Sequence, residues 1–210
     1  DCTLQLLSKC TGQEHVIFTS SSNIYGNTRF SEQLFTEKDI ANPSTVYAAS
    51  KIACEALIKT YYNLGRIKNY TILRLCGVLG PSLKHGLLKI LIDSLKSDPE
   101  KITMFGNWPG QIRSYIHVVD VISATIKSLG SVTPETLNIC NNDSISSKTV
   151  LDIVCKMMKL SPSCKWTSQN YNGDIQQQYL SNSYAKNLLG WQLQYPSSEE
   201  AIKQAIRENI

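Results

Sequence analysis

The fold of this chain is constrained most by a short apolar run at residues 15–19, HVIFT, which ends in three consecutive serines. A run without alternation of apolar and polar side chains is typical of a strand buried on both faces of a parallel sheet. An amphipathic helical pattern over residues 4–10 precedes it, and Gly12 would end that helix. Residues 20–22 therefore follow the carboxyl end of a buried strand, where open α/β sheets bind their ligands.

The rest of the chain alternates between helical and extended patterns. Residues 42–44, Asn-Pro-Ser, are helix start signals, and the helix after them carries on one face Val46, Ala49, Ala53, Ala56 and Leu57. We expect further helices at 86–96, 149–160, 183–189 and after the capping box that begins at Ser197. We expect further strands at 71–75, 102–105, 112–118 and 137–140. Strands alternating with helices predict an α/β fold, and the short elements beyond Pro99 predict a smaller second lobe.

Composition and charge exclude several classes of protein. Basic residues (21) outnumber acidic residues (17) only slightly and are scattered, unlike the clustered patch of a nucleic-acid-binding protein. No apolar run approaches the roughly 20 residues that span a bilayer, and the first residues lack a signal-peptide pattern. We therefore expect a cytoplasmic protein with neither nucleic acid nor membrane as a partner.

The cysteines and histidines do not form a recognisable site. The seven cysteines include no Cys-x-x-Cys pair, and most lie inside apolar segments. The three histidines stand far apart without the spacing of metal ligands. We expect buried free thiols and no metal site.

A tyrosine and a lysine, Tyr47 and Lys51 in the segment STVYAASK, lie four residues apart on the helix expected after residue 44. This spacing puts both side chains on one helix face. A lysine ammonium beside a phenol favours the phenolate, so such a pair could exchange a proton near neutral pH. Taken alone, the pair is better interpreted as a surface pair, because Tyr-x-x-x-Lys often occurs by chance, and residues 20–22 could equally be a turn or helix cap.

Six segments occur in the order and approximate spacing of one known family: VIFTSSSNIYG, NPSTVYAASK, LRLCGVLGP, RSYIHVVDV, TLNIC and AKNLLGW. Together they resemble the extended short-chain dehydrogenase/reductase family, which includes UDP-glucose 4-epimerase and the sugar-nucleotide dehydratases. The resemblance implies a Rossmann-like parallel sheet with a smaller α+β substrate-binding lobe. Residues 1–100 would form part of the catalytic domain and residues 101–210 mainly the lobe, with segments such as 112–140 returning to the sheet.

The resemblance also implies roles for individual residues. Tyr47 matches the catalytic acid/base, Lys51 the lysine that holds the nicotinamide ribose, and Ser21 the residue that binds the reacting sugar oxygen. Together with Ser20 and Leu75, the tyrosine and lysine would contact NAD or NADP. In the implied reaction the tyrosine removes a proton from a sugar hydroxyl while hydride passes from the carbon to the nicotinamide. Returning the hydride to the opposite face gives an epimer, and delivering it to a ketone gives a reduced sugar.

The implied contacts to a nucleotide-sugar substrate are Ser22, Asn23, Gly77 and Arg113. Arg113 resembles the arginine that binds the diphosphate, a role suited to a fork of donors. Dehydratases of the family have an Asp-Glu pair where this chain has Ser22 and Asn23, and those carboxylates serve the elimination of water. We therefore expect an NAD(P)-dependent epimerase or reductase. A dehydratase is the alternative if another carboxylate, such as Glu37 or Asp39, reaches the site.

The chain departs from the family pattern in three places. No Gly-x-x-Gly-x-x-Gly loop, which would bind the cofactor pyrophosphate, follows an N-terminal strand, and the family's first strands would lie before Asp1. Strand 15–19 would then expose an apolar edge. No asparagine follows shortly after the Leu-Arg of residues 73–74, and no arginine precedes residues 173–174, which leaves diphosphate recognition to Arg113. A non-catalytic binding or scaffold protein on the same fold is therefore a second alternative.

Two further expectations concern assembly and the pocket. The helix at 44–64 and the segment that ends near Cys10 match elements that often pair in homodimers of the family, so we expect a homodimer. The loop at residues 108–110, Trp-Pro-Gly, precedes Arg113 and would shape the sugar or base pocket, while His117 would pack structurally.

Overall fold

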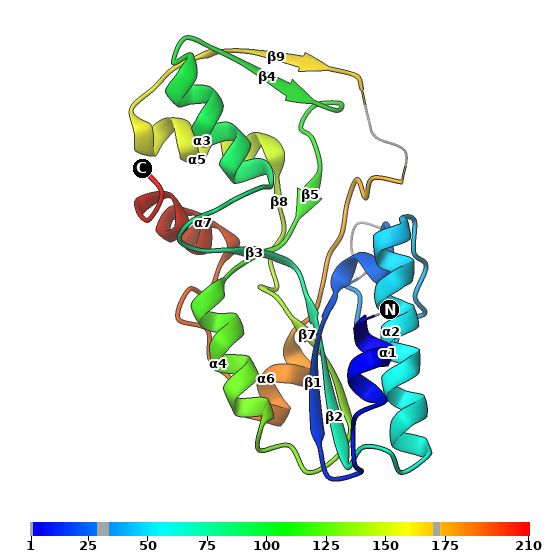
Figure 1. Cartoon of the computed structure of the whole chain (residues 1–210). Helices are drawn as coiled ribbons and strands as arrows, with labels where there is room; N and C mark the ends of the chain where they lie inside the picture. The colour runs from blue at the N-terminus through cyan, green and yellow to red at the C-terminus, as the bar shows by residue number, and fades with distance from the viewer. Residues whose placement is uncertain (1, 29–33, 170–172) are drawn as a thin grey trace.

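The computed structural model describes residues 2–28, 34–169 and 173–210. Its centre is a sheet of three parallel strands (Figure 1), which stand in the order β1 (His15–Ser21), β2 (Asn69–Leu75) and β7 (Glu135–Ile139). Leu75 at the end of β2 pairs with the last residue of β1 and with the last residue of β7. All three strands therefore end at one edge, where the serine segment begins.

Helices cover both faces of this sheet (Figure 1). On one face lie α1 (Cys2–Leu7) and α2 (Val46–Asn63), which share a core with the apolar side chains of β1. On the other face lie α4 (Val118–Ser128) and α6 (Ser183–Leu189), which pack around the buried Trp191. The predicted α/β fold with a Rossmann-like parallel sheet is confirmed.

Helix α2 forms where the sequence predicts it, but it turns a different face to the sheet. Its buried side chains are Ala48, Glu55 and Ile58. On the face picked out from the sequence, Val46 is 89% exposed, the three alanines are exposed, and only Leu57 packs against the core. The central buried position of α2 belongs instead to a charged residue, Glu55, whose partner lies in the sheet.

Strand β1 has one unpaired edge in the part of the chain that the structure describes, where β2 is its only strand neighbour. Residues 15–18 of β1 are only partly buried, whereas β2 is buried along nearly its whole length. The apolar edge expected from the sequence is therefore present in these residues. Such an edge is a template for pairing with a further strand.

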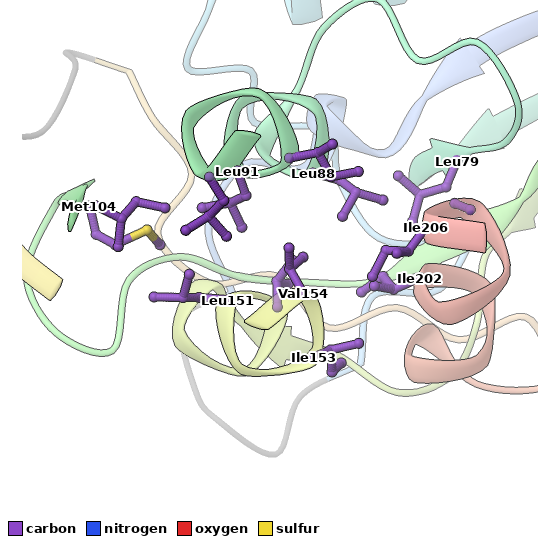
Figure 2. Close-up of a cluster of buried hydrophobic side chains, with 14 residues drawn as sticks. Leu79, Leu88, Leu91, Met104, Leu151, Ile153, Val154, Ile202 and Ile206 are labelled. Carbon is purple, nitrogen blue, oxygen red and sulfur yellow. The ribbon is translucent and has the colours of Figure 1, made fainter. Parts of the chain in front are cut away.

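The remaining elements form a smaller α+β lobe (Figure 1). Its helices are α3 (Leu87–Ser97), α5 (Ser147–Met158) and α7 (Ser198–Arg207), and its strands β4 (Lys101–Phe105) and β9 (Ser163–Thr167) pair in parallel. Figure 2 shows the core of the lobe, in which Leu88 and Leu91 of α3 face Leu151 and Val154 of α5. Ile202 and Ile206 of α7 complete this cluster.

Two short strand pairs lie where the sheet meets the lobe. β3 (Gly77–Leu79) pairs in parallel with β6 (Tyr115–His117), and β5 (Ile112–Arg113) pairs antiparallel with β8 (Ile145–Ser146). The single strand expected at 112–118 is therefore wrong, because β5 and β6 belong to different sheets and Val118 begins α4. Sequence periodicity does not reveal β3 or β8, since strands of three and two residues carry little pattern. It also misses the five-residue β9, whose first three residues are exposed.

Packing favours a particular division between the two parts. Helix α3 shares the lobe core with α5, although it precedes residue 100. Helix α6 packs with the sheet, although it lies beyond residue 140. We propose that the boundary lies near β3, with residues 115–139 and 183–191 returning to the sheet.

All seven cysteines are free thiols, as expected, but only Cys140 is buried. Cys2 and Cys164 are exposed and the others are partly buried, because the segments that carry them have one side at the surface. Across the described ranges, no helix combines the length and apolar character needed to cross a membrane. Nor do the same residues contain a group of three side chains of the metal-ligating types.

A buried ion pair connects α2 to the sheet. Arg74 of β2 donates from Nη2 to Glu55 Oε2 at 2.7 Å and from Nε to Oε1 at 3.1 Å, and the two side chains are 8% and 5% exposed. The carboxylate also accepts from Ser20 Oγ at 2.6 Å, and Arg74 Nη1 donates to Tyr25 Oη at 2.8 Å. Tyr25 in turn donates to Asn138 of β7 at 2.8 Å. Because buried polar groups are costly unless paired, this network fixes how these elements meet.

Glu55→Gln should destabilise the fold by about 3 kcal/mol or more, since it leaves the buried Arg74 guanidinium without a counter-charge. The matched control is Glu199→Gln, which breaks the exposed pair with Lys203 and should change the free energy of unfolding little. Urea unfolding at pH 7, followed by circular dichroism, measures both. Equally small changes in the two variants would contradict a structural role for the buried pair.

Candidate active site

A cavity of about 790 Å³ opens where β1 and β2 end, and side chains of the sheet and of the lobe line it together. Seven of the residues expected to carry function line this cavity: Ser21, Ser22, Asn23, Tyr47, Leu75, Gly77 and Arg113. Ser20 and Lys51 do not line it. The fold therefore brings these seven residues together, although they span 92 positions of the sequence from Ser21 to Arg113.

Ser21 stands at the last position of β1 and begins a short 3-10 helix, η1 (Ser22–Tyr25). Its Oγ accepts from the backbone N–H of Asn23 at 3.2 Å. Because Oγ accepts in this bond, the hydroxyl keeps its own proton to donate into the cavity. The capping and the functional readings of this serine are therefore compatible.

Tyr47 lies in the first turn of α2, which begins after Thr45 caps the N–H of Ala48. The tyrosine is 52% exposed and lines the cavity, and its hydroxyl has no hydrogen-bond partner among the described residues. Lys51, one turn later, holds its Nζ 5.7 Å from the centre of the Tyr47 ring and 4.9 Å from that of Phe18. It donates to the carbonyl of Thr19 at 2.9 Å. The two side chains share a face, as the spacing predicts.

Two residues expected at the cofactor lie in different surroundings. Leu75 lines the cavity at the end of β2. The Ser20 side chain points instead under α2, where it is buried and donates to Glu55. Its hydroxyl therefore serves the buried network rather than the cavity.

Arg113 of β5 is a cation that lines the cavity. Its Nη1 donates to Asn23 Oδ1 at 3.2 Å. Burial lowers the pKa of this guanidinium, and the neighbouring Tyr115 and Asp174 act in the opposite direction. A guanidinium remains charged at neutral pH even so, and its other donors stay available for a ligand.

The loop before α3 adds positive charge to the same cavity. Lys84 and His85 line the cavity beside Gly86, which precedes the first residue of α3 and provides no side-chain cap. The free N–H groups of a helix N-terminus favour an anion. These residues carried no signal in the sequence, because only the fold brings the loop toward Arg113.

Gln178 is a further residue of the cavity that sequence reasoning misses. It is 3% exposed, and its Oε1 accepts from Ser22 Oγ at 2.9 Å. It comes from the segment before α6, which is more than 150 positions from Ser22 and has no helical or strand periodicity. No local pattern could have indicated this contact.

The backbone makes a close approach at Gly77. A Cβ at this position would lie 2.9 Å from the ring of Tyr115, which also lines the cavity. Burial raises the pKa of Tyr115 to about 12, so this phenol stays neutral at physiological pH. The lack of a Cβ at Gly77 thus allows the Tyr115 ring to lie close to the backbone in the wall of the cavity.

The carboxylates considered for a dehydratase lie outside the cavity. Glu37 accepts from the backbone N–H of Asn138 at 2.7 Å, and burial raises its pKa. Asp39 accepts from the N–H and hydroxyl of Thr36. Among the described residues, the cavity lining includes no aspartate or glutamate.

Other expected features are also placed by the structure. Trp108 is 70% exposed and does not line this cavity. His117 is buried, lies 3.1 Å from Glu208 Oε2 and caps α4, which is a structural environment. Residues 170–172, where relatives have a second arginine, lie outside the described residues.

The residues present fit the nicotinamide side of a dinucleotide site. Tyr47 and Leu75 line the cavity, and Lys51 has used one of its three donors on Thr19, which leaves two for ribose hydroxyls. The printed sequence contains no glycine-rich loop for the pyrophosphate. These residues therefore fit the nicotinamide and its ribose but not the pyrophosphate.

Comparisons with known proteins identify relatives of this chain. Residues 2–140 match the NAD dependent epimerase/dehydratase family. The chain is 26% identical over 215 residues to UDP-glucuronate 4-epimerase of Thermodesulfobacterium geofontis, covering 99% of this chain and 64% of that protein. It is 26% identical over 203 residues to dTDP-D-glucose 4,6-dehydratase of Mus musculus, covering 93% and 55%.

A solved structure is similar as well. The UDP-glucose 4-epimerase of Thermus thermophilus, in complex with NAD, is 25% identical and has a TM-score of 0.86 over 98% of this chain and 68% of that chain. The chain spans less than two thirds of the length of the first curated relatives that it matches. From the family match and this fold, the chain belongs to the NAD-dependent epimerase/dehydratase family of extended short-chain dehydrogenase/reductases.

Proposed function

We propose that this chain forms the catalytic and substrate-binding part of an NAD-dependent epimerase of nucleotide sugars. The observation that carries the proposal is that Ser21, Tyr47 and Arg113 line one cavity. Oxidation of a sugar carbon needs a group that exchanges the hydroxyl proton, a group that orients the oxygen, and a cation that anchors the diphosphate. The relatives named UDP-glucose and UDP-glucuronate 4-epimerase support this substrate class.

Tyr47 is the proposed proton acceptor and donor at the sugar hydroxyl. Its own hydroxyl is free of partners in the described residues, and the tyrosine lines the cavity that the sugar would enter. The Lys51 ammonium supplies positive charge beside the anion that forms when Tyr47 gives up its proton. Ser21 donates to the same sugar oxygen and holds it in reach of the phenol.

Tyr47, Lys51 and Leu75 would hold the nicotinamide and its ribose. When bound, a nicotinamide dinucleotide supplies the acceptor and donor of hydride. The chain itself supplies orientation, exclusion of water and the site of the proton.

The phosphate end of the substrate is proposed to lie between Arg113 and the start of α3. Arg113 offers a fork of donors, and Lys84 adds a second positive charge from the loop before α3, which lines the same cavity. In this arrangement Lys84 is the second cation, in place of the arginine that many relatives have before residues 173–174. The mild positive charge of the whole chain agrees with an anionic substrate.

A dehydratase is the second candidate, favoured by the match to the mouse 4,6-dehydratase. Elimination of water needs a carboxylic acid beside the leaving hydroxyl. Ser22 and Asn23 are neutral, and Glu37 and Asp39 are held elsewhere. The absence of a carboxylate from the described lining therefore favours epimerisation.

Tyr47→Phe in the full-length protein should lower kcat by about a hundredfold or more, because it removes the group that exchanges the proton. The KM for the nucleotide sugar should change little, since Arg113 is intact. Absorbance of reduced nicotinamide and chromatography of the sugar products, with UDP-, GDP- and dTDP-hexoses, measure both. The control is Tyr184→Phe, which changes an exposed phenol of α6 that donates to Glu135.

Two outcomes would count against this proposal. Equal activity of wild type and Tyr47→Phe on every substrate would remove Tyr47 from the mechanism. A wild-type protein that shows no turnover and no calorimetric signal with NAD would favour the non-catalytic binding protein instead.

Arg113→Lys should raise the KM for the nucleotide sugar about tenfold or more, because an ammonium keeps the charge but loses the planar fork of donors. The control is Arg66→Lys, an exposed arginine far from the cavity in the turn after α2. Calorimetric titration with UDP measures the same loss without turnover. An unchanged UDP affinity would place the diphosphate elsewhere.

We also propose that the exposed face of α2 pairs with a second copy of the chain. Val46, Ala49, Ala53 and Ala56 form this face, and Leu4 and Leu6 of α1 are exposed as well. Small side chains allow two helices to approach closely. Pairing with a second copy would bury this apolar face of α2, which no other described element of the same chain covers.

Ala53→Glu should shift the protein from dimer to monomer in light scattering at micromolar concentration, because the charge would be buried in the interface. Val132→Glu changes another exposed apolar residue, 92% exposed beyond α4, and should leave the mass unchanged. A monomeric wild type would overturn the proposed pairing.

A further inference from the structure

The two residues that replace the acid pair of the dehydratases are both occupied by contacts of their own. Ser22 Oγ donates to Gln178 Oε1 at 2.9 Å, and Asn23 Oδ1 accepts from Arg113 Nη1 at 3.2 Å. Ser22 and Asn23 follow β1 of the sheet, whereas their partners come from β5 and from the segment before α6. Both positions therefore connect residues 21–26, which we call the serine turn, to β5 and to the segment before α6.

The amide of Gln178 uses both of its N–H donors and its oxygen in this arrangement. Besides accepting from Ser22 Oγ, its Nε2 donates to the carbonyl of Ser22 at 2.9 Å and to that of Gly26 at 3.1 Å. These two carbonyls mark the first residue of η1 and the residue that ends it. One buried side chain thus spans the whole turn that Ser21 caps.

The backbone of Gln178 continues the connection. Its N–H donates to the carbonyl of Ile112 at 3.0 Å, and Ile112 directly precedes Arg113 in β5. Its own carbonyl accepts from Ser144 Oγ at 2.9 Å. Gln178 therefore contacts the serine turn with its side chain and the arginine strand with its main chain.

We infer that Gln178 is a positioning residue, which holds the turn that carries Ser21 in register with the strand that carries Arg113. This inference rests on the proposed function, because Ser21 and Arg113 would grip the reacting sugar and the diphosphate of one substrate. The distance between Ser21 and Arg113 decides whether the sugar hydroxyl lies within reach of Tyr47. A misplacement of about 1 Å at a reacting centre can cost about a hundredfold in rate.

The contacts also explain why a change at Gln178 acts through the turn. Removing the two N–H donors leaves the buried carbonyls of Ser22 and Gly26 without this partner, which is costly. The turn then relaxes, and Ser21 moves with it because Ser21 Oγ accepts from Asn23 N–H within the same turn. Gln178 also lines the cavity. The test therefore has to distinguish positioning through the turn from a direct contact between Gln178 and the sugar.

The test compares Gln178→Met and Gln178→Glu with Gln176→Glu in the full-length protein. Methionine keeps the length without polar atoms, and glutamate keeps the shape without the two donors. Gln176 is exposed on the same segment and serves as the matched control. We expect both Gln178 variants to lose about tenfold or more in kcat, with the KM for UDP-hexose within about threefold, and the control to match wild type.

Ser22→Ala distinguishes positioning from direct contact through a double-mutant cycle. If Gln178 acts through the turn, the losses in kcat from Ser22→Ala and Gln178→Met combine to less than their sum, because the hydrogen bond between Ser22 Oγ and Gln178 Oε1 is lost in both variants. Additive losses, or a rise in KM without a loss in kcat, would show that Gln178 contacts the substrate directly and would overturn the inference.

Hydrogen–deuterium exchange tests the role of Gln178 without turnover of a substrate. In the ligand-free protein, the Gln178 variants should exchange faster in peptides that cover residues 21–26 and 110–114, while peptides of α5 and α7 remain as in wild type. If wild type turns over no nucleotide sugar, the proposed function fails, and this measurement still decides the role of Gln178. Unchanged exchange in both peptides would overturn the inference.

Discussion

The ion pair between Arg74 and Glu55 is the interaction on which the rest of the structure depends. An arginine in the middle strand of a buried sheet needs a counter-charge, and α2 provides it at the position where an apolar residue would otherwise pack. The same carboxylate takes the hydroxyl of Ser20, and the guanidinium reaches Tyr25 at the end of η1. The pair thus fixes the helix that carries Tyr47 relative to the strand end that carries the serines.

The cavity joins two parts of the chain that are held differently. On the sheet side, the buried network leaves little freedom between β1, α2 and β2. On the lobe side, Arg113 and Gln178 meet the serine turn through hydrogen bonds to Asn23 and Ser22. Ser22 and Asn23, which the family resemblance matches with the acid pair of dehydratases, therefore connect the turn after β1 to β5 and to the segment before α6.

Sequence patterns predict most of the sheet and the residues that lie on it. Local signals place residues 20–22 at a strand end and Tyr47 with Lys51 on one helix face, whereas the choice of Ser21 and the role of Tyr47 rest on the family resemblance. The buried position of Glu55 on α2 is missed, since periodicity cannot show that Glu55 has a partner in β2. Gln178 and the Lys84 loop are missed for the same reason, as their place in the cavity depends on contacts between distant segments. An arginine inside an apolar strand was the available signal for a buried carboxylate.

The most direct test of the account is a crystal structure of the full-length protein with NAD and a UDP-hexose. The account predicts that Tyr47 Oη and Ser21 Oγ both lie within about 3 Å of one sugar hydroxyl oxygen, with the diphosphate on Arg113. A sugar bound with that hydroxyl out of reach of Tyr47, or a diphosphate away from Arg113, would contradict it.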